Sequence, residues 1–146
     1  MLSKLLSTYN NITLEHLTNL DNNSILDELT SYSGVGLKTA NCVLLFALIR
    51  NVCPVDTHVH RLTNRIGIVE TTTPDKTSVI INGSMPDKIA HQFHTNLIRL
   101  GREICKSSKP HCFNCPLIRI CSYEAKDMDE TAVYKVNDFL LLDSIE

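Results

Sequence analysis

The sequence predicts an all-α protein, and three observations lead to that prediction. In most segments apolar residues recur three and four positions apart, the spacing that places them on one face of a helix. No run alternates apolar and polar residues for long enough to form a sheet. Glycine, proline and capping residues separate the apolar segments where helices would begin and end. We therefore expect a series of short helices and, at residues 105–121, a cysteine-rich loop.

Three helical segments are predicted before the first glycine turn, and a fourth follows it. Residues 2–9 carry leucines on one face, and Thr13 can cap a short helix over 14–20. Residues 22–32 begin with asparagine and serine, which accept hydrogen bonds from the first N–H groups of a helix, and continue with apolar residues at helical spacing. Residues 37–50 are nearly all apolar, so we expect this helix to be buried on most sides.

The second half of the chain begins with a proline stop. Pro54 disfavours helix at the residue before it, and Asp56 stands at a capping position for a helix that continues to residue 68. Residues 73–82 read as a short helix that starts at a Thr-Pro pair. Residues 85–105 form a longer amphipathic pattern. The acidic segment 122–146 ends in an apolar run, which suits either a docking helix or a loose tail.

Length and composition limit the classes of protein that fit. A chain of 146 residues suits one domain, or two small lobes that share a core. No apolar stretch is long enough for a transmembrane helix, and the first residues do not resemble a signal peptide. The six cysteines therefore indicate metal or redox chemistry in a reducing compartment rather than a disulfide framework.

Charge is segregated along the chain. Residues 34–121 contain eleven lysines and arginines against five acidic residues, whereas both flanking segments are acidic. A basic central body is compatible with binding to a phosphate backbone, and it is equally compatible with ordinary surface charge.

Two helices joined by Ser33, Gly34, Val35 and Gly36 form a helix–hairpin–helix pattern. Glycine adopts positive φ readily and allows another molecule to approach the backbone closely. A tight turn before a helix N-terminus also presents several N–H groups together, which makes an anion site suited to a DNA phosphate. The alternative is that the glycines only close a tight turn between two packed helices.

Four of the six cysteines are closely spaced, with the pattern C-x6-C-x2-C-x5-C. Such a set can surround one metal centre, either tetrahedral zinc or a [4Fe–4S] cluster with one cysteine on each iron. Zinc sites more often have a short C-x2-C pair at each end, and only one such pair is present here, so both occupants remain open at this point; we expect the other two cysteines to be small buried apolar residues. The predicted ligands are Cys105, Cys112, Cys115 and Cys121, and the two excluded cysteines are Cys42 and Cys53.

Taken together, these motifs resemble the endonuclease III branch of the helix–hairpin–helix DNA glycosylases. The resemblance rests on "SGVGLKTANCVL", "PVDTHVHRLTNRIGI" and "GREICKSSKPHCFNCPLIRIC", in that order, and covers roughly residues 24–121. It implies a partial helical barrel at residues 1–104 with the hairpin at about 24–50. It also implies an iron–sulfur cluster loop at 105–121, followed by an acidic tail at 122–146.

Two features depart from the family pattern. Ser33 stands where the family usually has proline, a mild change in the rigidity of the turn. Members of the family also carry several more helices before the hairpin, so we expect this chain to be truncated at its N-terminus. Those helices supply residues that enter the DNA and line the lesion pocket.

The resemblance implies that Lys38 is a nucleophile and Asp56 its partner. A neutral amine at Lys38 can attack C1′ of a damaged nucleotide, displace the base and form a Schiff base, after which β-elimination cuts the strand. We expect burial and the nearby helix N-terminus to favour the neutral amine. The Asp56 carboxylate can stabilise positive charge at the sugar and assist proton transfer. The alternatives are an ordinary surface lysine and a simple helix cap.

The implied substrate is double-stranded DNA that contains damaged bases, oxidised pyrimidines above all, or abasic sites. We expect a monomer that acts on the DNA of a prokaryotic cytoplasm, with no membrane partner. Two rival interpretations remain, a non-catalytic DNA-binding module and a zinc-binding structural protein. The predicted DNA contacts are Gly34, Val35, Gly36, Thr39, His58, Arg61 and Arg65.

Overall fold

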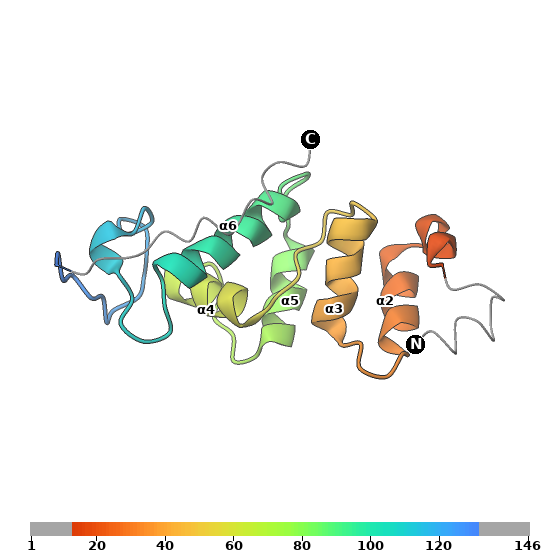
Figure 1. Ribbon diagram of the computed structural model, residues 1–146, viewed down its shortest axis with the longest axis horizontal. Helices are drawn as coiled ribbons and strands as arrows, with labels where there is room; N and C mark the ends of the chain where they lie inside the picture. The colour runs from red at the N-terminus through yellow and green to blue at the C-terminus, as the bar shows by residue number, and fades with distance from the viewer. Residues whose placement is uncertain (1–12, 132–146) are drawn as a thin grey trace. The chain divides into compact units, whose positions relative to one another are not determined.

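A computed structural model of the chain describes residues 13–131 (Figure 1). The described residues form helices and turns with no strand among them, which confirms the all-α prediction. The helix predicted for residues 2–9 lies outside the described part, as does most of the acidic segment 122–146. None of the described helices has the length and apolar character needed to cross a membrane.

The chain divides into two compact units, each made of two separate segments. We call Met1–Pro54 with Met85–His91 the hairpin unit, and Val55–Ser84 with Gln92–Glu146 the loop unit. The hairpin unit contains η1 (Glu15–Asn19), α2 (Asn22–Thr30), α3 (Leu37–Cys42) and η2 (Val43–Ala47). The loop unit contains α4 (Thr57–Ile66), α5 (Pro74–Gly83), most of α6 (Ala90–Glu103) and η3 (Cys112–Asn114).

Helix α2 begins at a strong side-chain cap. Asp21 accepts hydrogen bonds from the backbone N–H groups of Asn23 and Ser24, which have no acceptor within the helix. The Ser24 hydroxyl also donates to Asp21 and holds the pKa of that carboxyl below its usual value. The helix starts where the sequence predicted, but Asp21, just before the predicted segment, is the capping residue.

The segment before α2 differs from its prediction in one respect. It forms a short 3-10 helix, η1, whose N-cap is Leu14 without a side-chain hydrogen bond, so the predicted cap at Thr13 is wrong. η1 contributes Leu17 to the core of the hairpin unit, where α2 and α3 meet (Figure 1). The buried members of this core are Leu17, Ile25, Leu29, Tyr32, Ala40, Leu44 and Val52.

The predicted long helix over residues 37–50 is shorter and less buried than expected. α3 ends at Cys42, and the next turn, η2, widens to a π-helix over Val43–Ala47. Ala40 and Leu44 lie one turn apart on the buried face, whereas Phe46 and Ile49 are exposed. The sequence could not show this, because the segment has apolar residues all round and their pattern does not tell which of them pack in the core.

Ile49 ends this helix in a strained backbone conformation. Its φ is +52°, and the N–H of Arg50 closes the helix end by donating to the carbonyl oxygen of Leu44 at 2.8 Å. A β-branched residue is unfavourable in this left-handed region, where glycine is the usual occupant. The Ile49 side chain is 81% exposed, so little apolar burial offsets the strain.

We therefore expect Ile49→Gly to raise the free energy of unfolding by about 1 kcal/mol, because the relief of strain exceeds the added entropy of glycine. Urea denaturation measures the change. Ile80→Gly is the matched control, since Ile80 is an exposed isoleucine inside α5, where glycine should cost about 1 kcal/mol. An Ile49→Gly protein less stable than the parent would contradict the assignment of strain.

The loop unit confirms both predicted helix starts. Asp56 caps α4, and Thr73 caps α5, which has Pro74 at its first position. α4 ends at Gly67, whose φ of +93° requires glycine. α6 begins later than the pattern suggested, because Lys88 takes a positive φ and residues 85–89 are not helical.

Candidate functional site

The hairpin turn joins α2 to α3 in the hairpin unit and contains the two predicted glycines. Gly34 has φ +84°, so the turn needs glycine there. The N–H of Val35 donates to the carbonyl oxygen of Tyr32 at 3.1 Å and closes the turn. Gly36 has an ordinary φ of −93°, and a Cβ built on it would meet no atom within 4 Å. The fold of the described residues therefore does not require glycine at position 36.

The N-terminus of α3 differs from those of α2, α4 and α5. Each of those three helices has a side chain that accepts from its first N–H groups, whereas the N-cap of α3, Gly36, provides no side-chain hydrogen bond. The first N–H groups of a helix have no acceptor within it. The turn therefore presents backbone donors beside exposed positions at Gly34, Gly36 and Thr39.

Lys38 lies in the first turn of α3, next to these donors, and its side chain is exposed. The expectation that Lys38 is buried is therefore wrong. Position 38 lies away from Ala40 and Leu44, the two residues of this helical segment that belong to the core of the hairpin unit.

Asp56 lies in the loop unit, at the N-cap of α4. Its Oδ1 accepts from the N–H groups of His58 at 2.8 Å and Val59 at 2.9 Å. The other carboxylate oxygen, Oδ2, makes no hydrogen bond within residues 13–131. Asp56 is thus a helix cap that keeps one oxygen for a second interaction.

Arg61, one of the predicted DNA contacts, is engaged inside the loop unit. Its guanidinium donates to the carbonyl oxygens of Gly101 at 3.1 Å and Cys105 at 2.9 Å, and its Nη2 lies 3.1 Å from His58 Nδ1. A Cβ at Gly101 would lie 2.7 Å from His58 Nδ1, so this arrangement requires glycine. Arg61 connects the first turn of α4 to α6 and to the start of the cysteine loop.

Arg65, one turn further along α4, fastens the same loop. Its guanidinium donates to the carbonyl oxygens of Lys106 at 2.7 Å and Ser107 at 2.9 Å, and it lies 3.4 Å from Cys105 Sγ. The guanidinium also stacks over the ring of Tyr123 at 4.2 Å from the centroid. Both arginines therefore hold the cysteine loop, a role that the sequence did not indicate.

The four predicted cysteine ligands line one small cavity, which they share with apolar and aromatic side chains. Burial raises the pKa of the Cys115 thiol; a backbone hydrogen bond from Leu117 opposes this, and the other three thiols raise it further. No three His, Cys, Asp or Glu side chains of the described chain close on one metal-ion position. The cavity is lined by Cys105, Cys112, Cys115, Cys121, Ile104, Pro110, His111, Ile118 and Tyr123.

Cys42 and Cys53 lie outside this cavity, in the hairpin unit. Cys53 is fully buried, as predicted. Cys42 is only partly buried, which differs from the prediction.

A basic hollow lies beside the cysteine loop on the loop unit. Its basic residues are His58 and Arg61 from α4, Arg102 from α6 and Lys106 from the loop. Gly101, Ser107 and Ser108 complete the lining. Arg102 and Lys106 are exposed, so this hollow offers positive charge and hydroxyl donors to an anion.

The sequence missed some of these interactions. The hydrogen bonds of Arg61 and Arg65 join residues about forty positions apart, and no local pattern reports such a pairing. The one available signal was the i, i+4 spacing of the two arginines on a helix that also begins with Asp56.

Comparison with curated proteins finds close relatives over the middle of the chain. The chain is 39% identical over 98 residues to endonuclease III of Thermotoga maritima, which covers 67% of this chain and 46% of that protein. It is 37% identical over 102 residues to endonuclease III of Buchnera aphidicola, which covers 70% and 47%. The chain thus spans about half the length of these relatives. No family model matches it.

Solved structures give the same result. A non-covalent endonuclease III–DNA complex matches with a TM-score of 0.66 and 30% identity, over 82% of this chain and 52% of that chain. A trapped covalent endonuclease III–DNA intermediate matches with the same values.

Proposed function

We propose, on the basis that this chain is homologous to endonuclease III across about two thirds of its length, that it acts in base-excision repair of DNA. Its activity would be that of a bifunctional glycosylase and AP lyase on duplex DNA with damaged bases, oxidised pyrimidines above all, or abasic sites. It would act as a monomer in the cytoplasm of a prokaryote.

The observation that carries this proposal is the open N-terminus of α3. Unlike α2, α4 and α5, this helix leaves its first N–H groups without a side-chain acceptor, and two exposed glycines lie beside them. A DNA phosphate supplies the missing acceptor and is favoured by the helix dipole. Gly36, which the fold does not require, allows the phosphate to approach the backbone.

The proposed reaction places Lys38 at the sugar beside this phosphate. Nζ attacks C1′, the bond between C1′ and the base breaks, and the base leaves with the electron pair of that bond and takes up a proton. The attached amine then loses a proton and the bond between C1′ and O4′ breaks, which opens the sugar ring, leaves a protonated O4′ hydroxyl and gives a Schiff base between Nζ and C1′. Removal of a proton from C2′ expels the 3′ phosphate, and water hydrolyses the Schiff base. The exposure of Lys38 supports access to a sugar that has left the base stack.

Asp56 would assist proton transfer and stabilise positive charge at the sugar through Oδ2, the oxygen that capping leaves available. The basic hollow beside the cysteine loop would bind a second phosphate, with Arg102 and Lys106 exposed toward the strand. The predicted contacts at Val35, Thr39 and His58 remain part of this proposal.

We also propose that Cys105, Cys112, Cys115 and Cys121 hold a [4Fe–4S] cluster. Four thiols around one cavity fit its four irons, and the Arg65 guanidinium supplies a hydrogen-bond donor to a sulfur. The bound cluster would cross-link the loop, and no step of the reaction proposed for Lys38 transfers electrons.

Borohydride trapping on a duplex with one abasic site tests the function directly. The reagent reduces a Schiff base to a stable amine, so a lyase leaves a protein–DNA adduct on a denaturing gel. If the parent protein binds this duplex but leaves no adduct, the chain is a non-catalytic DNA-binding module instead.

Gly36→Ala tests the phosphate contact at the hairpin. Stability should be unchanged, because a Cβ at this position meets no atom, while affinity for DNA should fall about tenfold or more as the methyl group obstructs the phosphate. Melting temperature and fluorescence anisotropy measure the two quantities. Gly34→Ala is the control, because its positive φ predicts a loss of stability. If Gly36→Ala binds DNA with the affinity of the parent protein, the DNA phosphate does not contact the backbone at Gly36.

Asp56→Asn distinguishes the role of Asp56 as a helix cap from its proposed role in proton transfer. Asparagine caps helices as well as aspartate, so the fold should persist, but the rate of adduct formation should fall on the order of 100-fold. Single-turnover kinetics give that rate. The matched control is Asp21→Asn at the N-cap of α2, which also accepts from two backbone N–H groups and should keep the parent rate. If Asp56→Asn forms the adduct at the rate of the parent protein, Asp56 acts only as a helix cap.

A further inference from the structure

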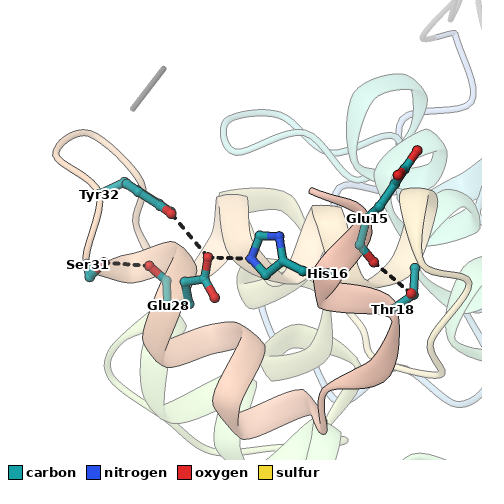
Figure 2. A network of polar contacts seen from close by, with 6 residues as sticks. All are labelled: Glu15, His16, Thr18, Glu28, Ser31 and Tyr32. Carbon is teal, nitrogen blue, oxygen red and sulfur yellow. Dashed lines mark hydrogen bonds and ion pairs between the residues drawn. The ribbon is translucent and has the colours of Figure 1, made fainter. Parts of the chain in front are cut away.

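A partly buried carboxylate joins three parts of the hairpin unit (Figure 2). His16, from η1, lies with Nε2 2.7 Å from Glu28 Oε1, and the Tyr32 hydroxyl donates to the same oxygen at 3.1 Å. Glu28 itself belongs to the last turn of α2, where its carbonyl oxygen accepts from the Ser31 hydroxyl. Through its hydrogen bonds, Glu28 Oε1 therefore links η1 and α2 to Tyr32, the residue that precedes the hairpin turn.

Tyr32 connects this network to the turn. Its side chain is 4% exposed and packs in the core of the unit. Its carbonyl oxygen accepts from the N–H of Val35, the hydrogen bond that closes the turn. Ser33, Gly34 and Gly36 are exposed and pack against little. The conformation of the turn therefore depends on how firmly Tyr32 is held.

We propose that Tyr32 and Glu28, with Glu28 oriented by His16, are positioning residues that set the hairpin turn for the DNA backbone. The inference rests on the proposed function of that turn. The hydrogen bond from the Tyr32 hydroxyl to Glu28 holds the tip of the tyrosine side chain in place, and the backbone of Tyr32 transmits that position to Val35 through the hydrogen bond that closes the turn. Hydrogen bonds to a carboxylate are the stronger kind, which suits such an anchor.

Tyr32→Phe removes only the hydroxyl and provides the central test. We expect affinity for a duplex with a stable abasic analogue to fall about three- to tenfold, while the single-turnover rate on saturating abasic DNA stays within about twofold. His16→Ala should weaken binding similarly, and His16→Gln, which can still donate to Glu28, should restore it. The double variant Tyr32→Phe with His16→Ala should lose less than the product of the two effects.

Thr18→Val is the matched control. It removes a hydrogen bond inside η1, from the Thr18 hydroxyl to the Glu15 carbonyl oxygen, which does not reach α2 (Figure 2). Its affinity should equal that of the parent. Parent affinity in Tyr32→Phe would overturn the inference, as would equal losses in His16→Gln and His16→Ala. If the parent protein binds DNA but forms no borohydride adduct, the proposed enzymatic function is wrong. The comparison of DNA affinities between the variants then still tests whether Tyr32 and Glu28 position the hairpin turn.

Discussion

Lys38→Ala is expected to abolish the borohydride adduct on abasic DNA while it leaves DNA affinity nearly unchanged. The amine that forms the Schiff base is lost, and no neighbouring lysine replaces it in α3. The backbone donors at the N-terminus of that helix do not depend on the side chain at position 38, so the phosphate contact should persist. Gel quantification of the adduct and fluorescence anisotropy measure the two effects.

The control for this experiment is Lys76→Ala. Lys76 is also exposed and lies in the first turn of a helix, α5, but it belongs to the loop unit and has no proposed role. It should form the adduct at the parent level. If Lys38→Ala still forms the adduct, another amine is the nucleophile and the assignment of Lys38 fails.

The exposure of Lys38 changes the physical account of its reactivity. The sequence suggested that the free protein already surrounds the amine with apolar groups, and the structure contradicts this. Exposure instead allows a flipped-out sugar to reach Nζ.

Local sequence signals predicted the helix starts well, because capping is a local interaction. Asp56 and Thr73 each accept from N–H groups two or three residues further along the chain, a distance that a short pattern captures. The same reasoning failed at Thr13, where the segment forms a 3-10 helix without a side-chain cap. It also started the next predicted helix at residue 22 and so did not identify Asp21, the preceding residue, as its cap.

Long-range side-chain pairings could not be predicted in the same way. Arg61 and Arg65 looked like phosphate contacts because they are basic and share a helix face. Their guanidinium groups instead donate to carbonyl oxygens of the cysteine loop about forty positions away. His16 and Glu28 are twelve positions apart in different helices, and neither belongs to a recognisable motif. Such pairings depend on packing, and one sequence does not specify it.

The cysteine loop should yield the second large effect. Protein purified without exposure to oxygen is expected to be yellow-brown and to contain about four irons per chain. Cys112→Ala should lose most of the iron and the visible absorbance, because one corner of the cluster loses its ligand. Cys42→Ala is the control, since Cys42 lies outside the cavity and should leave the iron content unchanged.

Loss of the cluster should also release the loop that α4 holds. The guanidinium groups of Arg61 and Arg65 bind carbonyl oxygens at Cys105, Lys106 and Ser107, and those carbonyls keep their places only while the loop stays folded. Metal binding and folding are coupled in such loops, so Cys112→Ala should increase proteolysis within residues 105–121 before the rest of the chain is cut. The Cys42→Ala protein should resist cleavage as the parent does. A colourless parent protein with one zinc per chain would show that the four thiols hold a single ion, and the cluster assignment would then be wrong.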